Sequence, residues 1–187
     1  MMSNFREISD STLNEIAEVF SRMEDKSVRE LIELIKETSR IFLLGAGREG
    51  LSVRAFTMRL MHLGKEAHWI WDDTTPAIGK RDLLICACGS ANVGHENYIA
   101  KMAKKNGARL ALITPSSEGY LISIADNIIN VPAEAYKAVG NFVFSEQLMG
   151  NLFEQTLFIL FDVLVMMLRE EMGISKEDMV SRHRNVE

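Results

Sequence analysis

Five short apolar runs alternate with amphipathic segments along most of the chain, and this alternation constrains the fold more than any other feature. The runs predict strands over residues 41–44, 67–71, 83–88, 108–114 and 127–131. The first run is continuously apolar and ends at Gly45, as expected of a parallel strand that is buried on both faces. Strands that alternate with helices predict a parallel sheet covered on both sides. We therefore expect an α/β fold, a three-layer α-β-α sandwich with a five-stranded parallel sheet.

The segments between these strands, and those at both ends, carry apolar residues at the three- and four-residue spacing of helices. We expect helices over residues 11–22, 28–38, 51–63, 93–105, 120–125 and 146–169, and a short one from Ser175. Asp10 or Ser11 is expected to cap the first helix, and Asn106 with Gly107 to end the helix at residue 105. No repeat or linker interrupts the pattern, so a single domain is expected. Its parts are N-terminal helices in residues 1–39, a sheet core in residues 40–131 and C-terminal helices in residues 146–187.

Composition limits the kinds of partner. The 187 residues are 47% apolar and carry a net charge of −5 without a basic run, so neither nucleic acid nor an anionic membrane surface is expected as a partner. Cys86 and Cys88 lie two apart in an apolar run, which is not the spacing of a disulfide framework. A cytoplasmic location is therefore expected. The first residues show no apolar signal core.

The stretch 148–168 is apolar nearly all round and raises the question of a membrane span. It contains Asn151, Glu154, Gln155 and Asp162, and its uncharged runs are too short to cross a hydrocarbon core of about 30 Å. We expect this helix to be buried in the core or in a subunit interface.

The expected topology locates a binding site. For five parallel strands the common order is 2-1-3-4-5, and ligands bind where the order reverses, between the first and third strands. The loops over residues 45–50 and 88–95 follow those two strands. We therefore expect these two loops to face each other across the site.

The first loop also matches a different function. Residues 45–50 read Gly-Ala-Gly-Arg-Glu-Gly, which fits the glycine pattern of nicotinamide dinucleotide-binding proteins, and Asp72 ends the second predicted strand, where a ribose-binding carboxylate would stand. Two helices precede the first strand, however, and Glu49 places a carboxylate beside the helix N-terminus that would hold a pyrophosphate. Dinucleotide binding is therefore a less favoured alternative, and a plain tight turn is another.

Five segments resemble the signatures of a known family. Residues 58–64 read Met-Arg-Leu-Met-His-Leu-Gly, residues 72–76 Asp-Asp-Thr-Thr-Pro, residues 88–91 Cys-Gly-Ser-Ala, residues 149–154 Met-Gly-Asn-Leu-Phe-Glu and residues 182–187 Arg-His-Arg-Asn-Val-Glu. Their order and spacing resemble the sugar-isomerase (SIS) domain family, most closely the 6-phospho-3-hexuloisomerases. The likeness runs from about residue 41 to the end and more weakly through the N-terminal helices. It implies the SIS domain fold with flavodoxin-like strand order.

The resemblance also implies an activity, the interconversion of 3-hexulose 6-phosphate and fructose 6-phosphate with no metal and no cofactor. Moving a carbonyl by one carbon through an enediolate needs a base for a carbon-bound proton and a group that shuttles protons between oxygens. The resemblance implies Glu154 as the base, in an apolar helix where burial raises a carboxyl pKa, and His183 as the shuttle. It further implies a phosphorylated sugar as ligand and a homo-oligomer, a tetramer or dimer, with shared sites.

The loops depart from the family pattern. Glu49 stands in place of a serine, and Cys88, Ala91 and Val93 stand in place of serine, glycine and threonine, which removes hydroxyls that grip phosphate. An ionised Glu49 would repel a phosphate. Either Glu49 turns away, or the ligand differs, or phosphate is not bound in the family's manner. A phosphosugar-binding protein without turnover, or with an altered ligand, therefore stays open beside the isomerase.

The remaining site residues are assigned to ligand binding by the same resemblance. They are Gly47, Arg48, Glu49, Gly89, Ser90, Ala91, Asn92, Thr74, Thr75 and His62. Thr74 and Thr75 alternatively shape the turn before Pro76, and His62 alternatively packs in the core or an interface. Glu154 is alternatively a capping or ion-paired glutamate near a helix start, and His183 is alternatively a solvated histidine of the C-terminal tail.

A metal site is the last alternative. Cys86 and Cys88 share a strand face, and His95 follows them, so two thiolates and an imidazole are close in sequence. No fourth ligand is evident, and we therefore expect no metal.

Overall fold

The five predicted strands form one parallel sheet in the predicted order, β2-β1-β3-β4-β5, in a computed structural model that describes residues 4–186. Residues 1–3 and Glu187, the last residue of the tail motif, lie outside the described residues. The strands are β1 (Arg40–Gly45), β2 (Glu66–Trp69), β3 (Asp82–Ala87), β4 (Arg109–Thr114) and β5 (Asn127–Asn130). The expected α/β class and strand order are therefore confirmed.

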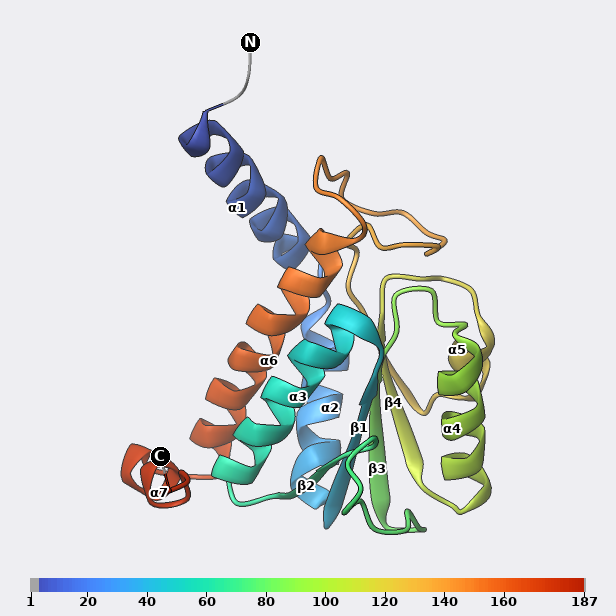
Figure 1. Ribbon diagram of the computed structural model, residues 1–187, viewed down its shortest axis with the longest axis vertical. Helices are drawn as coiled ribbons and strands as arrows, with labels where there is room; N and C mark the ends of the chain where they lie inside the picture. The colour runs from blue at the N-terminus through green and yellow to red at the C-terminus, as the bar shows by residue number, and fades with distance from the viewer. Residues whose placement is uncertain (1–3, 187) are drawn as a thin grey trace.

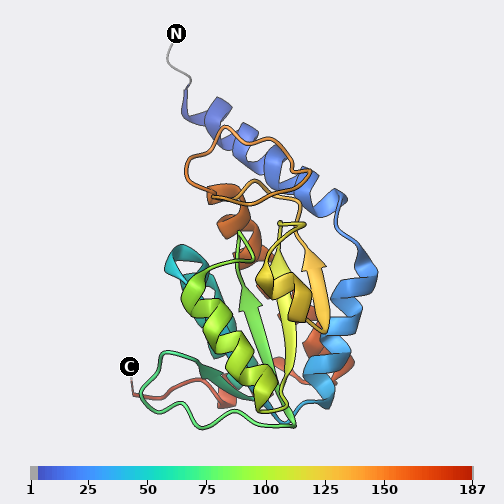
Figure 2. The same ribbon diagram turned by 90° about the vertical axis from the view of Figure 1, so that its right-hand side faces the viewer.

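Helices cover both faces of the sheet. The helices are α1 (Phe5–Ser21), α2 (Asp25–Glu37), α3 (Gly47–His62), α4 (Gly94–Lys105), α5 (Tyr120–Ile124), α6 (Asn151–Glu171) and α7 (Lys176–Ser181). In Figure 1, α2, α3 and α6 lie on one side of the sheet and α4 and α5 on the other. Both views show α1 extending beyond the sheet, past the start of α6 (Figure 1 and Figure 2). The arrangement is the three-layer sandwich that the sequence predicts.

The strands fill the core on both faces because successive side chains of a strand point in opposite directions. In β1, Ile41 and Leu43 join the apolar cluster under α2, α3 and α6, and Phe42 and Leu44 join the cluster under α4 and α5. All four are fully buried, and each contributes about 1.5–3 kcal/mol through the hydrophobic effect. This double burial explains why the run contains no polar residue.

Helix α1 starts six residues before the predicted position. The Asn4 side chain accepts a hydrogen bond from the Glu7 amide at 3.0 Å, and the Glu7 carboxylate accepts one from the Asn4 amide at 2.9 Å. This reciprocal capping box fixes the helix start, so the expectation of a cap at Asp10 or Ser11 is wrong. The predicted end of α4 is confirmed, since Asn106 is its C-cap and Gly107 adopts a φ of 87°.

Helix α6 starts at Asn151, five residues after the predicted position. Met149 and Gly150 have φ values of 59° and 83°, which an α-helix does not accommodate. A Cβ on residue 150 would lie 3.0 Å from the amide nitrogen of Tyr136, so glycine lets the loop that follows β5 pass close to the helix start. The segment 146–150 is therefore part of that loop and not of the helix.

By length and composition α6 also meets the criteria for a membrane span within the described chain. Half of its most apolar stretch is buried inside the fold, against α1, α2 and α3. These are the features of a core helix, as the sequence predicts.

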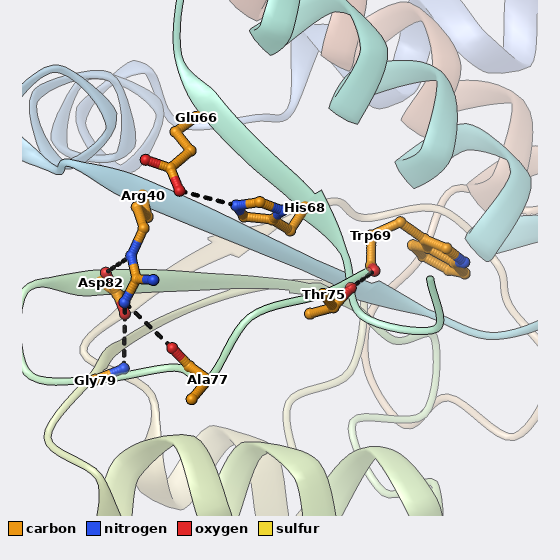
Figure 3. Close-up of polar contacts among 8 residues, drawn as sticks. All are labelled: Arg40, Glu66, His68, Trp69, Thr75, Ala77, Gly79 and Asp82. Carbon is orange, nitrogen blue, oxygen red and sulfur yellow. Dashed lines mark hydrogen bonds and ion pairs between the residues drawn. The ribbon is translucent and has the colours of Figure 1, made fainter. Parts of the chain in front are cut away.

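The amino end of the sheet, opposite the expected site, is held by a partly buried ion pair (Figure 3). Arg40 on β1 contacts both carboxylate oxygens of Asp82 on β3, with Nε to Oδ1 at 3.0 Å and Nη2 to Oδ2 at 2.7 Å. Asp82 Oδ2 also accepts a hydrogen bond from the Gly79 amide at 2.6 Å, and Arg40 donates another to the Ala77 carbonyl at 3.2 Å. These contacts fasten the β2–β3 connection to the sheet.

Candidate functional site

A cavity of about 370 Å³ lies at the carboxyl ends of β1 and β3, where the strand order reverses. Its wall is formed by the loop after β1, the loop after β3, the loop after β5 and the start of α6. The lining residues are Ala46, Gly47, Arg48, Glu49, Gly89, Ser90, Val93, Tyr136, Lys137, Met149 and Glu154. The predicted location of the site is thus the location of this cavity.

Glu154 and Arg48 form an ion pair in the wall of the cavity. Arg48 Nη1 lies 2.8 Å from Glu154 Oε2, and Arg48 also contacts the Asn151 side chain, so the start of α3 is joined to the start of α6. The Glu154 side chain is only 16% exposed, and its Oε2 makes the ion pair without an aligned hydrogen bond from the described residues. Burial raises the pKa of Glu154, and the charge of Arg48 partly offsets this. A raised pKa makes the Glu154 carboxylate a stronger base than an exposed glutamate.

Glu49 points into the site and not away from it. Its Oε1 accepts a hydrogen bond from the Gly89 amide at 3.1 Å, so its side chain bridges the two loops. The pKa of Glu49 is raised from 4.5 to about 8, mainly by burial and also by the nearby Glu96 and Glu154, while the Gly89 amide opposes them. Burial beside other carboxyls therefore favours the neutral form of Glu49, which lacks the charge by which an ionised carboxylate would repel a phosphate.

Gly89 is where a side chain would break this bridge. A Cβ there would lie 2.8 Å from Glu49 Oε1 and 3.2 Å from the Cβ of Ala135. A side chain at residue 89 would therefore displace the Glu49 carboxyl from the Gly89 amide and crowd Ala135.

Glu96 is a buried carboxyl that the sequence reasoning missed. It lies in the first turn of α4, is 0% exposed, and neither of its oxygens has an aligned hydrogen bond within residues 4–186. Burial raises its pKa, and the adjacent Cys88 thiol, His95 and Ala46 amide partly offset this. The signal was its helical phase, since Glu96, Ala100 and Ala103 fall on one face of α4 and all three are buried.

Tyr136 and Lys137 were also missed, because residues 132–145 read only as a loop. Met149 was not assigned to the site, because residues 146–169 were predicted to be a helix. The predicted strand order could have assigned the loop over residues 132–145 to the site. The loop follows the carboxyl end of β5, and the loops at the carboxyl ends of parallel strands gather at one edge.

The rest of the second loop serves its own folding. Ser90 lines the cavity, and its Oγ accepts a hydrogen bond from the Asn92 amide at 3.3 Å. The Asn92 side chain accepts one from Asn97 at 2.8 Å. Ala91 is buried at a φ of 50°, and its carbonyl accepts the Leu121 amide. Ala91 and Asn92 therefore lie next to the cavity without lining it.

Thr74 and Thr75 use their hydroxyls inside the turn. Thr75 Oγ1 donates to the Trp69 carbonyl at 2.6 Å (Figure 3), and Thr74 Oγ1 donates to Asp72 Oδ1 at 2.8 Å. The Thr74 amide also donates to that carboxylate and lowers the pKa of Asp72. These contacts agree with the alternative that Thr74 and Thr75 shape the turn. They also occupy the Asp72 carboxylate, which would have to bind a ribose in a dinucleotide-binding protein.

His183 and His62 lie at the opposite end of α3 from the cavity. Their rings stack with centroids 5.3 Å apart, and both line a second hollow of about 360 Å³ with Arg59. The tail is fixed there because Arg182 donates a hydrogen bond to the His62 carbonyl at 3.0 Å. Burial lowers the pKa of His62, and Arg59 and His183 lower it further. Helix α3 has 16 residues, and at 1.5 Å per residue it separates the two ends by about 24 Å. A single chain therefore does not bring His183 to Glu154.

The two cysteines are buried behind the loops. Burial raises the pKa of both the Cys86 and the Cys88 thiol, and Glu96 raises both further, so these thiols stay protonated. His95 instead lies beside the Trp71 ring, with centroids 5.8 Å apart. Among the described residues, no group of three or more histidine, cysteine, aspartate or glutamate side chains is placed to hold a metal ion.

Comparison with known proteins identifies relatives over nearly the whole chain, although no family model matches it. A Mycobacterium gastri protein named 3-hexulose-6-phosphate isomerase is 36% identical over 174 residues, which cover 93% of this chain and 87% of that protein. A Bacillus subtilis protein of the same name is 33% identical over 175 residues, covering 94% and 95%.

A solved structure gives the same result for the fold. A hypothetical protein of Methanococcus jannaschii, for which a molecular function of 3-hexulose-6-phosphate isomerase is inferred, matches with a TM-score of 0.81 and 28% identity. The match covers 97% of this chain and 99% of that one.

Proposed function

We propose, from the premise that this chain belongs to the SIS-domain phosphosugar isomerase family, that it interconverts 3-hexulose 6-phosphate and fructose 6-phosphate. One observation carries the proposal beyond family membership. Glu154 lies in the cavity at the sheet's reversal point, largely buried and paired with Arg48. A base in this position is what the reaction requires.

Glu154 is the group that removes the carbon-bound proton. In fructose 6-phosphate this is the proton on carbon 3, and its removal leaves an enediolate across carbons 2 and 3. Return of a proton to carbon 2 leaves the carbonyl at carbon 3, which is 3-hexulose 6-phosphate. The raised pKa of Glu154 brings its basicity closer to that needed, and Arg48 keeps the carboxylate oriented toward the cavity.

The phosphate is held by the two loops and the start of α3. The amides at an α-helix N-terminus point at an anion placed there, and Gly47 and Arg48 begin α3. Ser90 and Lys137 line the same cavity and supply a hydroxyl and a cation. These groups take over from the hydroxyls that the loop lacks.

His183 shuttles protons between the sugar oxygens, and this part of the proposal needs a second copy of the chain. The His62–His183 pair of one chain is placed over the cavity of another, because the two ends of α3 are too far apart within one chain. The adjacent helices α3 and α6 offer a surface for such assembly. Their exposed apolar side chains include Leu51, Met58, Phe158, Ile159, Val163 and Met166. Exposed apolar side chains on two helices that pack together are suited to association with another chain.

A phosphosugar-binding protein without turnover is the second candidate. It is favoured by the second loop, where Cys88 and Ala91 are buried and offer no hydroxyl to a ligand. Such a protein would hold the sugar phosphate in the same cavity and leave the carbon-bound proton in place.

Turnover separates the two candidates. We expect the chain to convert fructose 6-phosphate to its 3-keto isomer, and Glu154→Gln to reduce kcat by about 10²- to 10⁴-fold with little change in fructose 6-phosphate binding. Glu170→Gln is the matched control, since Glu170 lies exposed near the other end of α6. Binding without turnover in the unmodified chain would establish the second candidate. Equal turnover in the Glu154 and Glu170 variants would exclude Glu154 as the base.

A further inference from the structure

We propose that Glu49 binds the ligand's phosphate as a neutral carboxylic acid that donates a hydrogen bond, so that the site holds its ligand only while Glu49 keeps its proton. The inference rests on the proposed function, because it concerns how the same cavity holds a phosphorylated sugar. Ligand binding then depends on whether Glu49 keeps its proton, in a pH range where the phosphate itself does not titrate.

The contacts of Glu49 define what each of its oxygens can do. Oε1 accepts the Gly89 amide at 3.1 Å, so an amide from the second loop is already occupied by the protein. Glu49 lines the cavity, and no hydrogen bond from residues 4–186 reaches its Oε2. An ionised carboxylate would present only acceptors to a phosphate, whereas a carboxylic acid presents an O–H donor from Oε2.

The groups around Glu49 favour its neutral form. Glu154, in the first turn of α6, lines the same cavity as Glu49, and Glu96, in the first turn of α4, is fully buried near Glu49 without lining the cavity. The thiols of Cys86 and Cys88 lie on the sheet side and stay protonated. Burial, together with the nearby Glu96 and Glu154, raises the pKa of Glu49 to about 8 although the Gly89 amide opposes them.

The nearby cations do not reverse this preference. The Arg48 guanidinium is directed at Glu154, 2.8 Å away, and makes no ion pair with Glu49. Lys137 lines the cavity from the loop after β5, and no ion pair joins it to Glu49 either. Both cations are therefore available to offset Glu154 and the ligand, while Glu49 is left to hold a proton.

The ligand is expected to complete the hydrogen bond. A largely buried O–H donor needs an acceptor, and an anionic phosphate oxygen is a strong one. The second pKa of a phosphate ester is about 6, so the phosphate stays dianionic above pH 7. A change in affinity between pH 7 and 9.5 therefore reports on the protein.

The test is the affinity for fructose 6-phosphate across that range, measured by titration calorimetry with the unmodified protein, which keeps Glu154 beside Glu49. The sugar phosphate is first brought to equilibrium with the protein, so that no net turnover adds heat. We expect the Kd to change little up to pH 7.5 and then to rise about tenfold per pH unit, to about 30 times its pH 7 value at pH 9.5. At pH 9.5 binding should take up one proton, which appears as a dependence of the measured heat on the buffer's ionisation enthalpy.

Two substitutions isolate Glu49. Glu49→Gln keeps the shape and an N–H donor without an ionisable group, and Glu49→Ser provides a hydroxyl in case the amide does not fit. We expect the Kd of each to vary less than threefold from pH 7 to 9.5 and the proton uptake to vanish, while Glu170→Gln leaves the slope unchanged. A flat profile before Glu49 is changed, or an unchanged slope in both Glu49 variants, overturns the inference.

The inference and the proposed function fail separately. Turnover by the unmodified chain together with a flat binding profile overturns the role of Glu49 and leaves the isomerase. A pH slope that depends on Glu49, without turnover, overturns the isomerase and leaves the role of Glu49. No binding of fructose 6-phosphate at any pH overturns both.

Discussion

Glu49→Gln should remove a pH dependence of folding stability that the native chain shows between about pH 4.5 and 8. The folded protein keeps Glu49 protonated up to about pH 8, whereas the unfolded chain loses this proton near pH 4.5. The folded state therefore binds more protons in this window, and its free energy of unfolding falls as the pH rises. Glutamine cannot ionise, so the variant lacks this contribution.

The size of the effect follows from the shift in pKa. One unit of pKa corresponds to about 1.36 kcal/mol, so the shift from 4.5 to about 8 amounts to about 5 kcal/mol over the full window. Between pH 5.5 and 8.5 the native chain should lose about 3 kcal/mol more than the variant. Glu96 also titrates with a raised pKa, but it is present in both proteins, so its contribution largely cancels in the comparison.

Urea unfolding followed by circular dichroism at pH 5.5, 7.0 and 8.5 measures this difference for both proteins. The two stability curves should converge or cross as the pH rises, because only the native chain weakens through Glu49. If the difference between them changes by less than about 1 kcal/mol from pH 5.5 to 8.5, Glu49 is not a buried neutral carboxyl, and the reasoning on its protonation is refuted.

Two further outcomes are expected. Asp82→Ala should lower the free energy of unfolding by about 3 kcal/mol in urea titrations, because it leaves Arg40 and the Gly79 amide without their shared carboxylate; Asp82→Asn should cost less, and equal losses would contradict this account. Arg48→Met should move the acidic limb of the kcat/KM profile to higher pH, because the Arg48 charge lowers the pKa of Glu154. An unmoved limb would show that the ion pair does not set the basicity of Glu154.

The sheet and the place of the candidate cavity could be predicted from the sequence because both depend on local pattern and handedness. The buried run that ends at Gly45 identifies a parallel strand, and right-handed crossovers then bring the loops at residues 45–50 and 88–95 together. Glu49 and Gly89 line the same cavity for this reason. The predicted start of α6 was wrong because Met149 adopts a positive φ, and a methionine in the sequence does not indicate such a backbone conformation.

The charge states and side-chain orientations in the site could not be predicted from the local sequence pattern. The orientation of Glu49 depends on the Gly89 amide 40 positions away in the chain, and its protonation depends on the burial of Glu96 on another helix. The separation of His183 from Glu154 depends on how the tail docks, which Arg182 fixes against the end of α3. Each of these is a tertiary contact with no counterpart in composition or spacing.

Exchange of the carbon-3 proton of fructose 6-phosphate in D₂O, followed by NMR, is the most direct test of Glu154 as an isomerase base. Removal of this proton by the Glu154 carboxylate should let deuterium replace it, with the unmodified chain and with Glu170→Gln alike. We predict that Glu154→Gln slows the exchange by about 10²- to 10⁴-fold. No exchange with the unmodified chain, or exchange at an undiminished rate in the Glu154 variant, would contradict the assignment of proton abstraction to this residue.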